Sequence, residues 1–237
     1  MNRYDEIIAL RREFKRPGAL HHNKIQLRMV MWHFTIRCSA FFKRLMDIII
    51  SIVAIIVGSP IFLITALLIK LTSPGPIIFS QVRVGKFGRH FKFYKFRSMY
   101  IDAEKRKAEL MKQNESGDGV IFKIKRDPRI TPIGRFIRKF SIDELPQLFN
   151  VLLGDMSLVG PRPPLPTEVS AYTLEERKRL KITPGITCLW QVSGRSELPF
   201  SKQIALDKEY IASQSFWKDF LILLKTIPAI LTGKGAW

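Results

Sequence analysis

Asp143 and Glu144 are adjacent acidic residues in a strongly cationic part of the chain. The basic run at residues 135–139 precedes them, and a proline-rich loop at residues 160–163 follows. Neighbouring cations and a helix N-terminus favour the charged form of a carboxylate, so we expect the pKa of Asp143 to be depressed. An ionised carboxylate can attack phosphorus once cations mask the charge of a substrate. The pattern therefore predicts a site for phosphoryl chemistry.

The same two residues also have a purely structural interpretation, in which they cap a helix. Ser141-x-x-Glu144 has the form of a capping box, and an aspartate near a helix start can bond free amides and oppose the helix dipole. With Ser141 as the cap, Pro146 would remove a helical donor. With Asp143 as the cap, the proline would fall where amides have no intrahelical partner. The sequence leaves both interpretations open.

Glu144 and two arginines extend the candidate site. The glutamate can move a proton or help to hold Mg²⁺ through its oxygens. Arg162 lies in Gly160-Pro161-Arg162-Pro163, a stiff loop that can hold its guanidinium ready for a bidentate phosphate contact. Arg195, after Ser193-Gly194, is a weaker candidate of the same kind. The alternative for each arginine is an ordinary surface cation.

Further cations come from two other predicted elements. Arg138 lies in a short predicted helix immediately before the acidic pair. Lys95 belongs to a predicted strand at residues 91–96, where apolar side chains alternate with mostly basic ones, and Arg97 follows it. The alternation places Lys95 and Arg97 near a common surface. We include all three among the candidate phosphate ligands.

An apolar block at residues 48–69 meets the requirement of roughly 20 residues for a membrane helix. It lies too far from Met1 to be a signal peptide. Basic residues flank it on both sides, Lys43 before it and Lys70 after it, so both flanks have the charge expected of cytoplasmic segments. Ser59 and Pro60 at its centre predict a kink. A kinked helix can enter the membrane and return, and a single span with a tolerated proline is the alternative.

Composition sets the class of partner. The chain has 237 residues, 46% of them hydrophobic, and a net charge of +19. Such a charge implies an anionic partner, which could be nucleic acid, an acidic membrane surface or a phosphorylated substrate. Two distant cysteines, Cys38 and Cys188, match no metal-ligand spacing. We expect both to be reduced and buried.

The predicted fold class is α+β, mostly helical with a few short strands. Residues 1–40 form a basic extension, either an amphipathic helix on anionic lipid or a disordered tail; residues 41–72 form the membrane helix; residues 73–237 form the catalytic domain. Trp190 is expected in the core, and Trp217 and Trp237 at a membrane interface. The predicted strands are 77–79 and 91–96, and the predicted helices are 101–114, one around Arg138, 143–153 ending at Gly154, 168–181 and 200–231.

Several motifs in order resemble those of the bacterial sugar transferases, also called monotopic phosphoglycosyl transferases. The resemblance runs from about Phe41 to the C-terminus. It rests on Lys43-Arg44-x-x-Asp47, Ser59-Pro60, Ser73-Pro74-Gly75-Pro76, Gln81-x-Arg83-x-Gly85, Lys95-Phe96-Arg97-Ser98-Met99, Asp143-Glu144-Leu145-Pro146-Gln147, Gly154-Asp155-Met156-Ser157-x-Val159-Gly160-Pro161-Arg162-Pro163 and Pro184-Gly185-Ile186-Thr187.

This resemblance implies transfer of a sugar 1-phosphate from a UDP-sugar to a polyprenol phosphate such as undecaprenyl phosphate, the first step of exopolysaccharide, capsule, O-antigen or glycoprotein glycan synthesis. By likeness, Asp143 would be the nucleophile, with release of UMP, and Glu144 the second member of the acidic pair. Mg²⁺ would bridge Asp143 and the diphosphate, while Arg138 and Arg162 would bind phosphate oxygens. The family's Ser-Pro helix re-enters the cytoplasmic face of the bacterial inner membrane, and a homo-oligomer is compatible with this scheme.

Two departures and one rival hypothesis qualify the resemblance. Cys188 stands where the family commonly has glycine, which puts in doubt any turn there that needs a positive φ. Larger relatives carry N-terminal membrane helices that this sequence lacks, although its end at residues 233–237 resembles their hexose-transferring ends and favours UDP-glucose or UDP-galactose. A membrane-tethered nucleic-acid-binding protein is the rival, but it leaves Asp143, Glu144 and the apolar block unexplained, so we expect no nucleic acid partner.

Overall fold

The computed structural model describes residues 19–110, 124 and 127–233. The chain divides into two compact units, Met1–Lys43 and Arg44–Trp237. In the first unit, the described residues 19–43 are helical and belong to helix α2 (Ala19–Thr72), so a disordered tail is wrong for residues 19–40. The second unit holds every candidate site residue, and the following paragraphs describe it.

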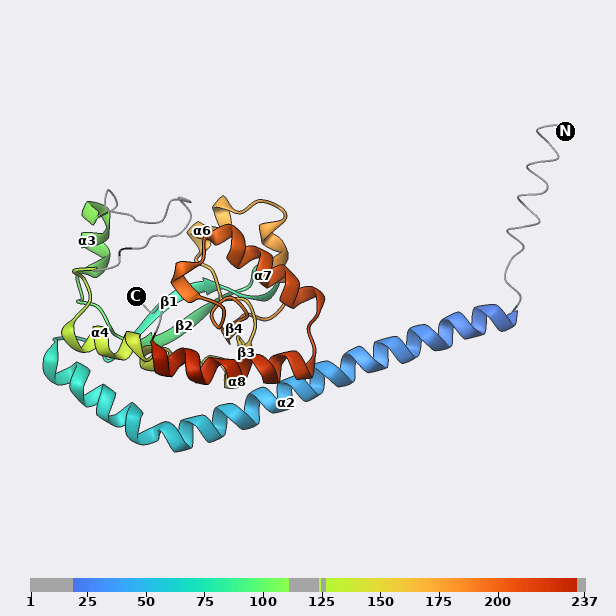
Figure 1. Ribbon diagram of the computed structural model, residues 1–237, viewed down its shortest axis with the longest axis horizontal. Helices are drawn as coiled ribbons and strands as arrows, with labels where there is room; N and C mark the ends of the chain where they lie inside the picture. Colours follow the sequence, from blue (N-terminus) through green and yellow to red (C-terminus); the bar gives the residue numbers. More distant parts are fainter. Residues whose placement is uncertain (1–18, 111–123, 125–126, 234–237) are drawn as a thin grey trace. The chain divides into compact units, whose positions relative to one another are not determined.

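Helix α2 contains the predicted apolar block. Its segment Arg37–Thr72 is long and apolar enough to cross a membrane, with a mean hydropathy of 2.8. Beyond Lys43, one face of the helix is buried, at Asp47, Ser51, Thr65 and Ile69. The other face exposes large apolar side chains: Ile49, Ile52, Val53, Ile56, Val57, Leu63, Ile64, Leu67 and Leu71. Pro60 lies inside the helix, and the ribbon of α2 bends in its cyan part, before Thr72 (Figure 1).

Both ends of this apolar segment are bound to the rest of the unit. Near the start, Arg44 donates to the carbonyl oxygens of Val151 (2.5 Å) and Leu152 (2.9 Å), in the last turn of helix α5 (Gln147–Leu153). At the far end, Nη2 of Arg97 donates to the carbonyl and hydroxyl oxygens of Ser73, at 2.8 and 2.7 Å. These contacts hold the apolar segment against the domain at two points.

A two-stranded antiparallel sheet carries one side of the candidate site. Strand β1 (Ile78–Val84) pairs with β2 (His90–Phe96), from Ile78 opposite Phe96 to Val84 opposite His90. The short helix η1 (Lys86–Gly88) joins them, with positive φ at Phe87 and Gly88. The predicted strand at 91–96 is confirmed, and the one at 77–79 continues five residues further than expected, to Val84.

A second, parallel pair is formed by β3 (Ser157–Val159) and β4 (Gly185–Thr187). Their backbones approach so closely that a Cβ on Gly185 would overlap the backbone of Gly160. Cys188 follows β4, is buried and does not have a positive φ, so a side chain is tolerated there. Burial is thus confirmed for Cys188 and wrong for Cys38, which is half-buried.

Helices α3 (Ala103–Leu110) and α4 (Pro132–Lys139) confirm two predicted helices, although residues 111–114 lie outside the described part.

Three predicted helices are wrong as single elements, because each contains two separate elements in the structure. Residues 143–153 begin with a separate 3₁₀ turn, η3 (Ile142–Glu144), before α5. Residues 168–181 contain α6 (Pro166–Ala171) and η4 (Glu176–Lys181). Residues 200–231 contain α7 (Phe200–Ala212) and α8 (Phe216–Thr232), with Ser215 capping α8 through the amide of Lys218. A last 3₁₀ turn, η5, spans Arg195–Glu197.

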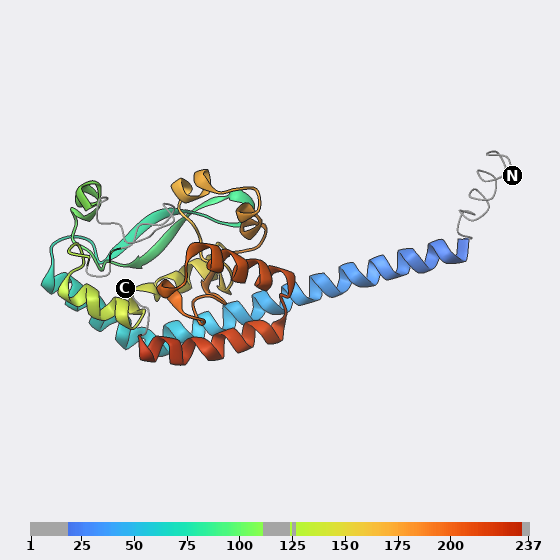
Figure 2. The same cartoon turned by 45° about the horizontal axis from the view of Figure 1, so that its top comes forward.

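The main hydrophobic cluster joins β2, α5, β3, α7 and α8, with side chains of α2 packed against it. Its buried members are Phe91, Phe93, Leu148, Val151, Met156, Leu158, Val159, Tyr210 and Ile222. Helices α8 and α2 run along the same side of the domain (Figures 1 and 2). Trp190 is buried as predicted, Trp217 on α8 is 70% exposed, and Trp237 lies outside the described residues. The fold is mostly helical with short strands, as predicted.

Candidate active site

Asp143 lies on the 3₁₀ turn η3 between helices α4 and α5. Thr131 caps the start of helix α4, because its hydroxyl accepts a 2.9 Å hydrogen bond from the amide of Gly134. After this helix the backbone turns at Ser141, which has a positive φ of 54°. The Asp143 side chain that follows is only 6% exposed.

The helix-capping interpretation of the acidic pair is wrong. Ser141 makes no side-chain cap hydrogen bond, and the N-cap position of α5 is Pro146. Pro146 explains why η3 and α5 are separate elements. Proline has no backbone N–H to donate, so it is tolerated at the start of a helix and not in its interior. Gly154 ends α5 with a φ of 89°, as the sequence predicts. Asp143 is thus held on a turn of its own, free of the capping role that could have explained it.

The pKa of Asp143 is raised to about 6, which contradicts the depressed pKa expected from the sequence. Burial is the largest cause, because it penalises the charged carboxylate, and the negative charge of Glu144 is the second. The positive charges of Lys95, Arg138 and Arg162 act in the opposite direction without offsetting these effects. Asp143 is therefore ionised above about pH 6 and poorly hydrated.

The fold brings three predicted cations to Asp143 from three different elements. Lys95 comes from β2, Arg138 from the last turn of α4, and Arg162 from the loop after β3. Desolvation lowers the pKa of Lys95 to about 8, with the charge of Asp143 opposing the shift. The ammonium group of Lys95 lies 5.8 Å from the ring centre of Phe79, its partner across the sheet. The result is a buried carboxylate surrounded by cations.

Glu144 faces Arg162 across 4.0 Å, measured from Oε1 to Nη1. Both side chains are partly exposed, so this pair contributes little to stability. Because the two groups are 4.0 Å apart and partly exposed, they do not form a tight ion pair. Both side chains are therefore available to bind a ligand. The side chains of Asp143 and Glu144 therefore have different surroundings, one buried and one open.

Arg83 supports the loop that carries Arg162, and it is a residue absent from the predicted site. Its Nη1 donates to the carbonyl oxygen of Pro163 (3.1 Å), and the amide of Val84 donates to that of Pro164 (2.9 Å). Arg83 is 7% exposed, and burial, followed by the charge of Arg162, lowers its pKa to about 10. The motif Gln81-x-Arg83 could have pointed to this residue from the sequence. Its two side chains are joined in the structure, where Nη2 of Arg83 donates to Oε1 of Gln81 (3.0 Å).

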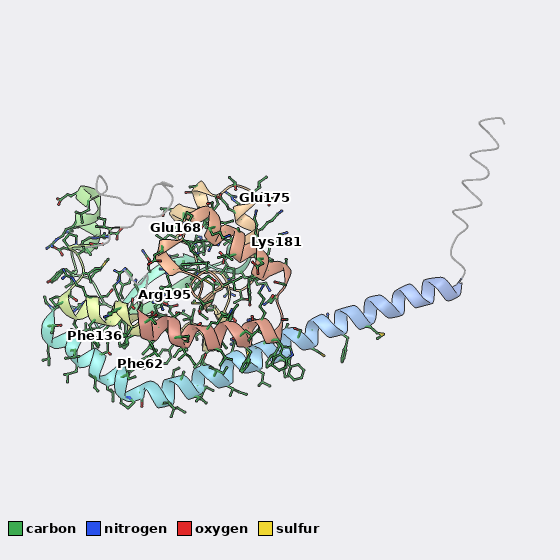
Figure 3. The ribbon with its side chains drawn as sticks, in the orientation of Figure 1. Phe62, Phe136, Glu168, Glu175, Lys181 and Arg195 are labelled. Atoms are coloured by element: carbon green, nitrogen blue, oxygen red, sulfur yellow. The ribbon has the colours of Figure 1, made fainter. Side chains whose placement is uncertain are left out.

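Arg97 and Arg195 have other surroundings. The hydrogen bonds of Arg97 go to Ser73 at the end of α2, so its phosphate-binding role stays a prediction. Arg195 lines a pocket together with Glu144, and burial lowers its pKa while the charge of Glu144 opposes the shift. Figure 3 labels Arg195 near the C-terminal end of α8.

A metal ion at this site would need oxygen atoms from a ligand. Among the described residues, no group of three or more histidine, cysteine, aspartate or glutamate side chains could hold one. Mg²⁺, however, is usually bound by one or two carboxylates together with substrate phosphates. Asp143 and Glu144 fit that requirement, with the cations nearby left to contact the remaining phosphate oxygens.

Comparisons with known proteins point to one protein family. A family model described as "Bacterial sugar transferase" matches residues 38–233. The galactosyl transferase CpsE of Streptococcus agalactiae is 48% identical over 82% of this chain and 43% of its own length. The undecaprenyl-phosphate galactose phosphotransferase of Salmonella typhimurium is 41% identical over 91% of this chain and 46% of its own length. The exopolysaccharide production protein ExoY of Sinorhizobium fredii is 38% identical over 82% and 88%. The chain spans less than half the length of the first two relatives.

Proposed function

Because this chain belongs to the bacterial sugar transferase family, we propose that it transfers a sugar 1-phosphate from a UDP-sugar to undecaprenyl phosphate. The name of the Salmonella relative supports an undecaprenyl phosphate acceptor, and the names of the Salmonella and Streptococcus relatives support galactose as the sugar. A role in exopolysaccharide synthesis is supported by the name of the Sinorhizobium relative. The observation that carries the proposal is the buried Asp143 among Lys95, Arg138 and Arg162.

In the first step, a carboxylate oxygen of Asp143 attacks the phosphorus that bears the sugar. The bond from that phosphorus to the bridging oxygen of the diphosphate breaks, and UMP leaves with the electron pair. The sugar phosphate is now esterified to Asp143. The poor hydration of Asp143 supports this role, since a buried carboxylate has few water molecules to shed before it attacks.

In the second step, a phosphate oxygen of the lipid attacks the same phosphorus. The bond to Asp143 breaks, the carboxylate is restored, and a lipid diphosphate sugar is formed. If the attacking oxygen carries a proton, Glu144 accepts it, because its partly exposed carboxylate can exchange that proton with water. Arg138, Arg162 and Lys95 would neutralise phosphate charge in both steps.

Mg²⁺ would be held by Asp143 and oxygens of the diphosphate, and the adjacent Glu144 could contribute a further oxygen. When bound, the ion supplies positive charge that neutralises the phosphate oxygens and makes UMP a better leaving group. The protein side chains then position the donor. Arg162 is well suited to this, because Arg83 and Val84 fix the loop that carries it.

We further propose that α2 enters the cytoplasmic leaflet of the inner membrane, bends at Ser59 and Pro60, and returns to the same face. Support comes from the two attachments of the apolar segment, at Arg44 and at Ser73, which both join it to one domain. A helix that crossed the bilayer would carry these two ends to opposite sides. The re-entrant arrangement would keep the active site at the headgroups, where a soluble UDP-sugar can meet a lipid phosphate.

The decisive experiment uses purified protein in detergent with Mg²⁺ and a UDP-hexose but no lipid. The proposal predicts a mass increase equal to one hexose phosphate on the peptide that contains Asp143, with one equivalent of UMP released. Asp143→Asn should give neither product. A wild-type protein that transfers the sugar phosphate to the lipid without ever carrying the adduct would disprove the covalent route.

The membrane arrangement has its own test. Lys43→Cys and Lys70→Cys, each in a protein whose Cys38 and Cys188 are replaced by serine, would be labelled in intact cells and in inverted membrane vesicles with a thiol reagent that does not cross membranes. Both positions should react only in inverted vesicles. Labelling of the two positions from opposite sides would establish a span.

A further inference from the structure

A pocket of about 100 Å³ opens beside Glu144, on the side of η3 that faces helix α8. Three segments form its walls: the turn with the start of α5, strand β4 with the loop after it, and the C-terminal half of α8. Its apolar lining consists of Leu145, Leu148, Ile186, Val192, Ala229 and Ile230. The mechanism proposed above uses only the edge of this pocket, at Glu144.

Most polar groups along the pocket wall already have partners. The hydroxyl groups of Thr187 and Thr226 are 2.8 Å apart, and that of Thr226 also donates to the carbonyl oxygen of Ile222 (2.8 Å). The amide oxygen of Gln191 accepts a hydrogen bond from the thiol of Cys188 (3.1 Å). These contacts leave mainly hydrocarbon surface for a ligand along most of the pocket.

One end of the pocket is different, because it is charged. Glu144 and Arg195 both line it, and Ser141 adds a hydroxyl. Within the part of the chain that the structure describes, Nη1 of Arg195 is a buried donor without a hydrogen-bond partner. A buried, unpaired guanidinium nitrogen is costly and marks a place where an anionic group would gain a strong hydrogen bond. The pocket therefore suits a ligand with an anionic head and an apolar tail.

The exposed outer face of α8 is apolar, which indicates that the apolar tail of the ligand would approach the pocket along this helix. Its large apolar side chains are exposed, among them Trp217, Leu221, Leu224, Ile227 and Leu231. The inner face of the same helix contributes Thr226, Ala229 and Ile230 to the pocket. Hydrocarbon surface is thus present on both faces of one helix, next to the turn that carries Asp143.

From these observations we propose that this pocket binds the isoprenoid segment next to the phosphate of the acceptor, with Arg195 contacting that phosphate. The inference rests on the proposed function and assigns a site to its lipid substrate. A hexose would be a poor occupant, because its several hydroxyl groups would meet mostly apolar walls. The location beside Glu144 would bring the phosphate of the lipid toward the phosphorus held by Asp143.

The test separates the two half-reactions. Ala229→Phe fills the pocket from α8, and its matched control is Ala212→Phe, the same substitution at an exposed position at the end of α7. Exchange of labelled UMP into the UDP-hexose, measured without lipid, reports the donor step alone. Transfer to undecaprenyl phosphate and to the short analogue geranyl phosphate reports the acceptor step.

For Ala229→Phe, we expect the KM for both acceptors to rise by about tenfold or more while UMP exchange stays within about twofold of wild type. Ala212→Phe should match wild type in both assays. A change in UMP exchange and donor KM with an unaltered acceptor KM would assign the pocket to the sugar, and no change in either assay would show that it is not a substrate site. Both outcomes overturn the inference.

A second measurement needs no variant, so it holds even if Ala229→Phe fails to fold. Wild-type protein would be irradiated with a geranyl phosphate that carries a diazirine on its first isoprene unit, and the labelled peptides would be identified. Label on residues 186–195 or 226–230 is expected, and label confined to other segments would refute the site. Failure of the proposed function would look different, since wild-type protein would then show neither UMP exchange nor transfer.

Discussion

The carboxylate of Asp47 accepts a 3.0 Å hydrogen bond from the backbone amide of Leu158, 111 residues further along the chain. Asp47 lies at the start of the apolar segment of α2, and Leu158 is the central residue of β3. Strand β3 leads directly into the loop that carries Arg162. One buried contact therefore joins the proposed membrane helix to the strand that leads into the proposed phosphate-binding loop.

Asp47→Ala should lower the free energy of unfolding by about 1–3 kcal/mol, because it leaves the buried amide of Leu158 without its acceptor. Asp47→Asn, whose side-chain oxygen can still accept this hydrogen bond, should lose less. Thermal unfolding in one detergent would compare the two variants. Equal melting temperatures for Asp47→Ala and wild type would contradict the importance of this contact.

The rate of UMP exchange should fall on the acid side with an apparent pKa near 6. The carboxylate form of Asp143 is the nucleophile, and burial raises its pKa to about 6, so the reactive form is lost as the pH decreases through that value. A profile of kcat/KM for the UDP-hexose between pH 5 and 9 measures it. Glu144→Gln should move this limb to lower pH, since the charge of Glu144 is the second cause of the shift.

The same profile should show an alkaline limb near pH 8 that depends on Lys95. The pKa of its ammonium group is lowered to about 8, so the cation next to the donor phosphates disappears as the pH rises through that value. In Lys95→Arg the cation persists, because arginine stays charged throughout the range. The limb should therefore vanish in this variant even if its maximal rate is lower. An unchanged alkaline limb would exclude Lys95 as its origin.

Asp143→Asn should be more stable than wild type at pH 7.5, by up to about 3 kcal/mol. The pKa of Asp143 is higher in the folded state than its usual value near 4, so the folded state binds the proton more tightly. The resulting stabilisation is complete below about pH 4 and is lost as the pH rises to about 6. The melting temperatures of Asp143→Asn and wild type should therefore differ at pH 7.5 and be nearly equal at pH 4. A less stable variant at neutral pH would show that the charged carboxylate is well solvated.

Arg83→Met should reduce kcat/KM for the UDP-hexose by roughly ten- to a hundredfold, because a misplaced Arg162 costs transition-state contacts. The methionine keeps much of the packing against Phe93 but loses the hydrogen bonds to Pro163 and Gln81. Arg89→Met, on the exposed end of the same hairpin, is the control for lost charge. Equal losses in both variants would mean that net charge, and not the loop, is responsible.

Local patterns predicted most of the elements but not their breaks. The alternation at residues 91–96 and the glycine at 154 each specify local structure directly, and both predictions are confirmed. The division of residues 200–231 into α7 and α8 was missed because the apolar periodicity continues on both sides of Ser213–Ser215. The start of α8 is marked by Ser215, whose side chain caps this helix.

The candidate site divides in the same way. The cations near Asp143 could be anticipated, since Arg138 and Arg162 flank it in the sequence. The sign of its pKa shift could not, because charge can be counted in a sequence while burial depends on how β2, α4 and the loop after β3 pack around the turn. Arg83 was missed for a related reason: its hydrogen bond to Pro163 joins residues 80 positions apart.

The double attachment of α2 matters for any attempt to dissect this protein. Phe62 packs against the main hydrophobic cluster and against a second cluster of three buried residues, Ile69, Phe96 and Ile137. Ile69 is fully buried. Deleting the apolar segment of α2 to obtain a water-soluble fragment would therefore also remove part of the hydrophobic core. The apolar helix is a wall of the domain itself, and whatever surrounds its outer face, bilayer or detergent micelle, becomes a determinant of folding yield.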